Sequence, residues 1–195
     1  TNKQVVPPHN KKHETYEEIW EVYKHYYEII EHCLATTNNI QHDIWRKQNM
    51  ALFNSLLKPD CLDKGQHIGN MGYRYNATFN VESCGQITMV NAFAALKKLV
   101  YDDRKYSLAD IKDAIENNFG FKSAEEIGSF SLAAQEKREQ SDKYEEIHSD
   151  CLKTPKYGND EQAADSILEE YEEWFCQMCR GVESMFGKPM YSCQI

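Results

Sequence analysis

The chain has little of what interrupts or spans a fold. It holds 9 Gly and 5 Pro among its 195 residues. Because these two residue types mark turns, their scarcity favours long helices over β structure with many turns. No apolar run reaches the ~18–20 residues that a transmembrane helix needs, so the sequence predicts a soluble protein. The chain also lacks internal repeats and low-complexity tracts.

Positive charge is in short supply as well. The chain has 22 Lys and Arg against 31 Asp and Glu, which gives a formal net charge of −9. A polyanion such as nucleic acid, or an anionic membrane surface, attracts basic proteins and repels acidic ones. The charge balance therefore argues against both as the main partner.

The seven cysteines follow no disulfide-framework spacing, and the first residues of this sequence do not have the pattern of a signal peptide. This usage is typical of a reducing compartment, so we expect a cytoplasmic protein. Cys176 and Cys179 form a C-x-x-C pair, but they lie deep inside a predicted helix rather than at its N-terminus. No second pair or suitably spaced histidines complete a metal site. We expect structural thiols, although the sequence leaves the role of this pair open.

What is present is mostly helical periodicity. One long helix, or two in sequence, is expected from Thr15 to about Lys58, where Pro59 ends it. A glycine-bearing loop follows over residues 60–72, and its order of helix, loop and strand matches no phosphate-binding fingerprint. Further helices are predicted over residues 86–100, 108–119, 132–139, 144–152 and 161–185. In the last of these, the residues predicted to face inward are Ala164, Ile167, Leu168, Tyr171, Phe175 and Met178.

One strand is expected in this mainly α chain, over residues 73–82, where apolar and polar residues alternate. Period 2 places Glu82 on the polar face with Arg74 and Asn80. If the strand is an outer one, this face meets water. If it lines a barrel or cleft, Glu82 becomes a partly desolvated carboxylate. Burial would then raise its pKa and Arg74 would lower it, which suits a group that takes or shares a proton.

The chain starts at Thr1 without Met and stops in residues 190–195, which have the pattern of a strand beginning. Such ends are unusual for a self-contained domain. We therefore expect a single internal segment, residues 1–195, of something longer.

Several segments resemble the glycyl radical enzymes of the pyruvate formate-lyase type. They are residues 64–85 (KGQHIGNMGYRYNATFNVESCG), 94–103 (AALKKLVYDD), 117–119 (NNF) and 156–160 (KYGND). Residues 43–47 (DIWRK) and 55–63 (SLLKPDCLD) narrow the resemblance to the hydroxyphenylacetate decarboxylases. The resemblance implies that the chain is part of a ten-stranded barrel wrapped in helices, within a protein several times longer.

Both radical centres of that family would lie outside the chain. The thiyl-forming cysteine belongs to a Cys-x-Glu segment, and none of the seven cysteines has Glu two residues later. The radical-bearing glycine belongs to an Arg-Val-(Ala/Ser)-Gly loop that is also missing from these residues. The resemblance therefore implies no cofactor bound by this segment and an isolated fragment without activity.

One functional residue carries over by position. In the hydroxyphenylacetate decarboxylases, the glutamate of the Asn-Val-Glu segment contacts the phenolic hydroxyl of the substrate, and here that glutamate is Glu82. The implied parent activity converts 4-hydroxyphenylacetate, a small aromatic acid, to p-cresol and CO2. The implied partners are a radical-SAM activating enzyme, a small iron–sulfur subunit and further copies in an oligomer.

Alternatives remain open at this point. Pocket residues outside the segment share the choice of substrate, so a related decarboxylase of phenylacetate or indoleacetate, or another glycyl radical lyase, fits the same residues. A helical interaction module without catalysis is the alternative of a different class. The sequence that flanks the segment would distinguish the two. A Cys-x-Glu segment before it and a glycyl radical loop after it indicate an enzyme, and their absence indicates an interaction module.

Overall fold

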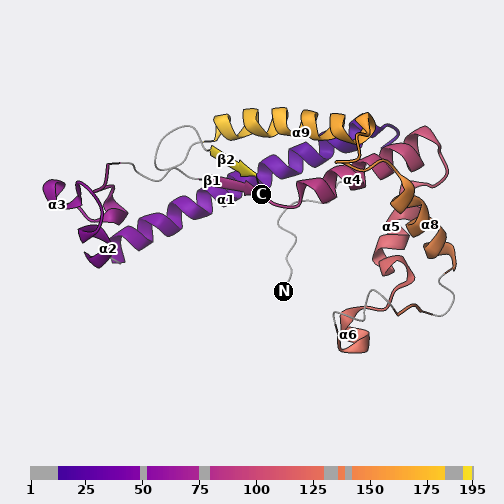
Figure 1. The fold of residues 1–195 in the computed structure, drawn as a ribbon, viewed down its shortest axis with the longest axis horizontal. Coiled ribbons are helices and arrows are strands. Elements are labelled where there is room, and N and C mark those ends of the chain that lie inside the picture. Colours follow the sequence, from indigo (N-terminus) through magenta and orange to yellow (C-terminus); the bar gives the residue numbers. More distant parts are fainter. Residues whose placement is uncertain are drawn as a thin grey trace. The chain divides into compact units, whose positions relative to one another are not determined.

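The computed structural model describes residues 13–48, 52–74, 80–129, 136–138, 142–182 and 191–194. They contain the helices α1 (Tyr16–Gln48), α2 (Leu52–Leu56), α3 (Cys61–Lys64), α4 (Gln86–Leu96), α5 (Leu108–Glu116), α6 (Ala124–Ile127), α8 (Asp142–Lys153) and α9 (Gln162–Gly181), the short 3-10 helices η1 (Ile68–Asn70) and η3 (Asn118–Gly120), the π-helix η2 (Lys97–Asp102), and the strands β1 (Asn80–Ser83) and β2 (Tyr191–Gln194) (Figure 1). The prediction of a mainly α chain with a short β element is confirmed. None of the described helices is long and apolar enough to cross a membrane.

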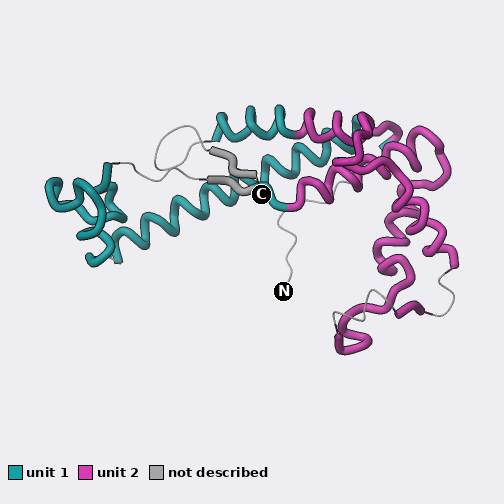
Figure 2. Tube along the Cα trace, viewed as in Figure 1, with its two compact units in different colours: residues 1–13, 17–84, 172–195 teal, residues 14–16, 85–171 magenta. Residues whose placement is uncertain are grey.

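The chain divides into two compact units (Figure 2). Unit 1 comprises residues 1–13, 17–84 and 172–195, and unit 2 comprises residues 14–16 and 85–171. Unit 1 therefore contains nearly all of α1, the C-terminal half of α9 and both strands. The prediction that residues 1–195 are a single internal segment of a longer protein is not tested by this division and stays a prediction.

In unit 1 the C-terminal half of α9 packs against α1. The ring of Tyr27 on α1 makes edge-on contacts with Phe175, at a centroid distance of 5.8 Å, and with Trp174, at 5.7 Å. Phe175 is fully buried and Cys179 is 2% exposed. All six residues predicted to face inward on α9 are buried, which confirms that part of the periodicity.

In unit 2 the helices α5 and α8 enclose a small core. Ile111, Ala114 and Ile147 are its buried residues, and Phe119 and Tyr144 are among the partly buried side chains around them. Ser107 begins α5 with a capping box, because its hydroxyl accepts from the N–H of Asp110 and its own N–H donates to the Asp110 carboxylate. The predicted helix start at Ser107 is confirmed. The predicted stop at Gly120 is wrong, because α5 already ends at Glu116 with Asn117 as its C-cap, and Gly120 belongs to the separate 3-10 helix η3.

The first predicted helical region forms two helices in sequence, one of the two possibilities that the periodicity left open, since α1 ends at Gln48 and α2 covers Leu52–Leu56. Two further predicted elements differ from the structure. The expected helix over residues 132–139 falls mainly outside the described residues, and its described part, residues 136–138, is not helical because Lys137 forms an antiparallel bridge with Phe121. The expected strand over residues 73–82 is described only from Asn80 onwards, and residues 73–74 form a bend.

Candidate functional site

The strand that carries Glu82 pairs with a strand from the far end of the sequence. β1 and β2 run parallel, with Glu82 opposite Cys193 and Ser83 opposite Gln194. The strand-like pattern of residues 190–195 is thus confirmed over Tyr191–Gln194. The backbone of Glu82 is held in this ladder, while its side chain lies outside the described part of the chain.

The end of β1 is fixed by burial and by a glycine turn. Ser83 is 2% exposed, so the strand enters a packed environment at the residue after Glu82. Gly85 then adopts a left-handed conformation, with φ of +79°, and α4 begins at Gln86. Glycine adopts this left-handed conformation readily because it has no Cβ, whereas L-residues with a Cβ are strained there. The sequence Glu82-Ser83-Cys84-Gly85 therefore changes the chain from strand to helix within three residues of the glutamate.

Arg74 does not share a strand face with Glu82, which corrects the prediction. Its guanidinium donates to both carboxylate oxygens of Asp60, at 2.7 and 2.9 Å. This hydrogen bonding lowers the pKa of the Asp60 carboxyl below its ordinary value. The alternating pattern was misleading because residues 73–74 form a bend before β1, where an ion pair with a loop residue holds the arginine.

Cys179 of the C-x-x-C pair lies near a buried acid that the sequence reasoning missed. Glu31 on α1 is 5% exposed, its Oε2 has no hydrogen-bond partner, and burial raises its pKa. Burial, followed by the charge of Glu31, raises the pKa of the Cys179 thiol to about 11. An activated thiol has a lowered pKa, so Cys179 has the character of a packed, inert thiol. The spacing along α1 could have indicated this burial. Glu31 lies eleven residues after Trp20 and four before Ala35, separations that place all three on one face of the helix, and both of these neighbours are buried.

The glycines of the loop after α3 serve close packing. A Cβ at Gly72 would lie 2.1 Å from the backbone oxygen of Gln66, and a Cβ at Gly69 would lie 2.3 Å from the ring of Trp45. Side chains cannot be added at either position without moving these neighbours. Close packing therefore explains why glycine occupies positions 69 and 72, and no phosphate-binding role is needed to account for them.

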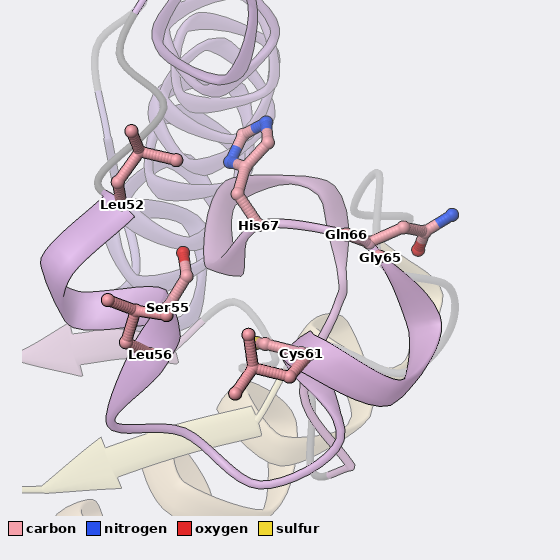
Figure 3. A pocket seen from close by; sticks show the side chains of 8 residues that line it. Leu52, Ser55, Leu56, Cys61, Gly65, Gln66 and His67 are labelled. Carbon is pink, nitrogen blue, oxygen red and sulfur yellow. The ribbon is translucent and has the colours of Figure 1, made fainter.

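A cavity of about 340 Å³ opens beside the same loop (Figure 3). Its lining residues come from α2, α3 and the following turn, and they are Leu52, Ser55, Leu56, Cys61, Leu62, Gly65, Gln66 and His67. Glu82 is not among them. Within the described ranges, no group of three or more His, Cys, Asp or Glu residues is placed to hold a metal ion.

Comparison with known proteins identifies the family. The sequence matches the pyruvate formate lyase-like family over residues 1–194. It is 58% identical over 194 residues to the 4-hydroxyphenylacetate decarboxylase glycyl radical subunit of Clostridioides difficile. The aligned region covers 100% of this chain and 22% of that subunit. It is 36% identical over 159 residues to the indoleacetate decarboxylase of Tractidigestivibacter scatoligenes, over 80% of this chain and 18% of that protein. The chain thus spans about a fifth of the length of these relatives.

The fold agrees with this match. A solved structure concerned with 1,2-propanediol dehydration in Roseburia inulinivorans superimposes with a TM-score of 0.72 at 22% sequence identity, over 93% of this chain and 21% of that one. The mainly helical arrangement is therefore that of part of a larger known fold. The chain belongs to the pyruvate formate lyase-like family of glycyl radical enzymes.

Proposed function

We propose that the chain is part of a glycyl radical decarboxylase that converts 4-hydroxyphenylacetate to p-cresol and CO2. The observation that carries this proposal is the 58% identity, over the whole chain, to a subunit with that named activity. In the net reaction the bond between the carboxyl carbon and the methylene carbon breaks, CO2 leaves from the carboxylate, and the methylene takes up one proton, so that no oxidant or reductant is consumed. The radical centres belong to polypeptide outside these residues, since no cysteine here has the Cys-x-Glu pattern.

The proposed task of Glu82 is to hold the phenolic hydroxyl and accept its proton. Loss of CO2 by a radical route moves electron density into the ring, and a carboxylate that takes the para-hydroxyl proton assists this movement. A hydrogen bond to a charged group contributes about 1.5–3 kcal/mol, which is enough to distinguish a hydroxylated ring from a bare one. The place of Glu82 at the end of a paired strand supports this task, because such a backbone is well held.

The wider setting follows from the same proposal. A radical-SAM activating enzyme would generate the radical on the full-length protein, a small iron–sulfur subunit would accompany it, and the complex would be oligomeric and cytoplasmic. The net charge of −9 agrees with a partner set that includes neither nucleic acid nor a membrane surface.

The test uses a full-length chimera, in which this chain replaces the matched residues of the C. difficile subunit. After anaerobic activation, we expect Glu82→Gln to lower kcat/KM for 4-hydroxyphenylacetate by roughly 10- to 150-fold, which corresponds to the loss of one charged hydrogen bond. The matched control is Glu125→Gln, which makes the same change at an exposed position on α6. Equal kcat/KM for Glu82→Gln and the unchanged chimera would refute the role of Glu82.

A second substrate has an observation in its favour, namely the 36% identity to an indoleacetate decarboxylase. Indoleacetate has no phenolic hydroxyl, so a carboxylate positioned for that group would give it little advantage. We expect the chimera to prefer 4-hydroxyphenylacetate over indoleacetate and phenylacetate in competition. A preference for indoleacetate would replace the first proposal with the second.

A further inference from the structure

An exposed apolar surface lies around the cavity in unit 1. We define the apolar patch as five side chains that are between 57% and 73% exposed, which are Leu52, Phe53, Leu56, Leu57 and Leu62. They fall within eleven consecutive residues, on α2, α3 and the turn between them. Single exposed leucines are ordinary, whereas a cluster of this kind marks an interaction site.

The frame beneath the patch is well held, so its exposure does not result from a frayed end. Cys61 is 3% exposed and is one of the residues that line the cavity. Gly65 closes α3 in a left-handed conformation, with its N–H bonded to the carbonyl of Leu62 at 3.1 Å. Arg74 holds Asp60, the residue before α3, through two hydrogen bonds. The patch is thus presented on a preformed surface.

The cavity suits an apolar side chain better than a polar ligand. Three of its lining residues are leucines of the patch, namely Leu52 and Leu56, which are labelled in Figure 3, and Leu62. The hydroxyl of Ser55, a polar group in the lining, already accepts a hydrogen bond from the N–H of Ile68 at 2.9 Å. Burial of an apolar group here removes leucine surface from water and leaves that hydrogen bond intact.

We infer that the apolar patch is an intramolecular docking surface, covered by polypeptide of the same enzyme subunit that lies outside residues 1–195. An aliphatic or aromatic side chain of that polypeptide enters the cavity. This inference rests on the proposed function, which makes the chain part of a longer enzyme. The relatives that match the whole chain are more than four times its length, since it covers only 22% of them. A second copy of this chain is disfavoured as the occupant because each copy has a charge of −9.

The test measures maleimide labelling of Leu62→Cys in the isolated chain and in the full-length chimera, with peptides quantified by mass spectrometry. In the chimera we expect the labelling rate to fall about tenfold or more below the rate in urea, because the patch is covered. In the isolated chain we expect a rate within about twofold of the rate in urea. Cys61 is the internal control, because it is buried in the cavity lining and its protection reports whether the isolated chain has folded.

Each outcome decides the inference. Labelling of Leu62→Cys in the folded chimera at the rate found in urea overturns it, because the patch is then open to solvent. Protection in the isolated chain, together with a dimer mass by light scattering, also overturns it in favour of a second copy. An active chimera with an open patch refutes this inference alone, whereas a protected patch in a chimera without decarboxylase activity refutes the proposed function alone.

Discussion

At the residue scale, the buried carboxylate of Glu31 makes the stability of the chain depend on pH. Burial raises its pKa above the ordinary value of 4.5, so the folded state binds a proton more tightly than the unfolded state. The resulting stability is present below pH 4.5 and is lost as the pH rises through the folded-state pKa. Tyr27 hydrogen-bonds to Glu31 and Cys179 lies near it, but the burial effect is the largest.

We expect Glu31→Gln to remove this loss. Above the folded-state pKa, the variant should be more stable than the parent chain by on the order of 1 kcal/mol, because no charge is then buried. Urea unfolding of both proteins over a series of pH values measures the difference. Other carboxylates, such as Asp60, are present in both proteins and cancel. A difference that does not grow with pH would contradict the assignment.

Gly72 provides a second prediction at this scale. The Cβ of an alanine at this position would lie 2.1 Å from the backbone oxygen of Gln66. Gly72→Ala must therefore displace main chain, and we expect it to destabilise the protein by about 3 kcal/mol. Gly65→Ala is the matched control, because Gly65 has a φ of +62° but open space around its Cβ position. We expect the control to cost about 1 kcal/mol through backbone strain alone. Equal unfolding midpoints for the two variants would show that the contact at Gly72 relaxes without cost.

At the scale of elements, two helices begin with the same capping box and should respond differently to its loss. Ser107 caps α5, which has nine residues and buries Ile111 and Ala114. Ser123 caps α6, which has four residues and buries none of them. We expect Ser107→Ala to lower the free energy of unfolding by about 1 kcal/mol and Tm by roughly 2–4 °C.

The comparison with Ser123→Ala isolates the contribution of the helix. We expect that variant to unfold within about 0.5 kcal/mol of the parent, because α6 can fray without exposing a core. Thermal unfolding followed by circular dichroism measures both. A larger Tm change for Ser123→Ala than for Ser107→Ala would contradict this account of the two helices.

Helix boundaries were predictable where their cause is local. Ser107 with Asp110 begins α5, and α2 ends at Leu56, shortly before Pro59; both signals act on nearby residues. The buried face of α1 was not. Ile30 and Cys33, which recur at helical spacing, are exposed in this structure, whereas Glu31 and Ala35 are buried. Burial of that helix depends on α9, more than a hundred residues later, and periodicity along one segment contains no such information.

The candidate site shows the same limit. A strand over residues 73–82 and the beginning of another over residues 190–195 were expected, but the parallel pairing of β1 with β2 was not. The ion pair between Arg74 and Asp60 joins residues fourteen apart and removes the arginine from the expected strand face. The π-helix Lys97–Asp102 was also missed. The N–H of Asp103 donates to the carbonyl of Lys98, five residues earlier, where the sequence predicted a single helix over residues 86–100.

At the scale of the whole molecule, the proposed function gives the 195 residues one substrate contact and places both radical centres in polypeptide outside them. We expect the isolated chain to show no decarboxylation of 4-hydroxyphenylacetate after treatment with an activating enzyme, because no residue in it matches the Cys-x-Glu or glycyl radical patterns. Gas chromatography of p-cresol measures this, with the chimera as the positive control. Turnover by the isolated chain would contradict the placement of the radical centres outside it.

The pairing of β1 with β2 also has a consequence for how the chain folds. Glu82 and Cys193 are about 110 residues apart in sequence, and most of unit 2 lies between them. The entropy lost when so long a loop closes must be offset by contacts that form at the same time. Helices such as α5 and α8, which are close in sequence, can form first, and the strand ladder that holds Glu82 forms late. The proposed substrate contact would then be among the last parts of the chain to reach its native geometry.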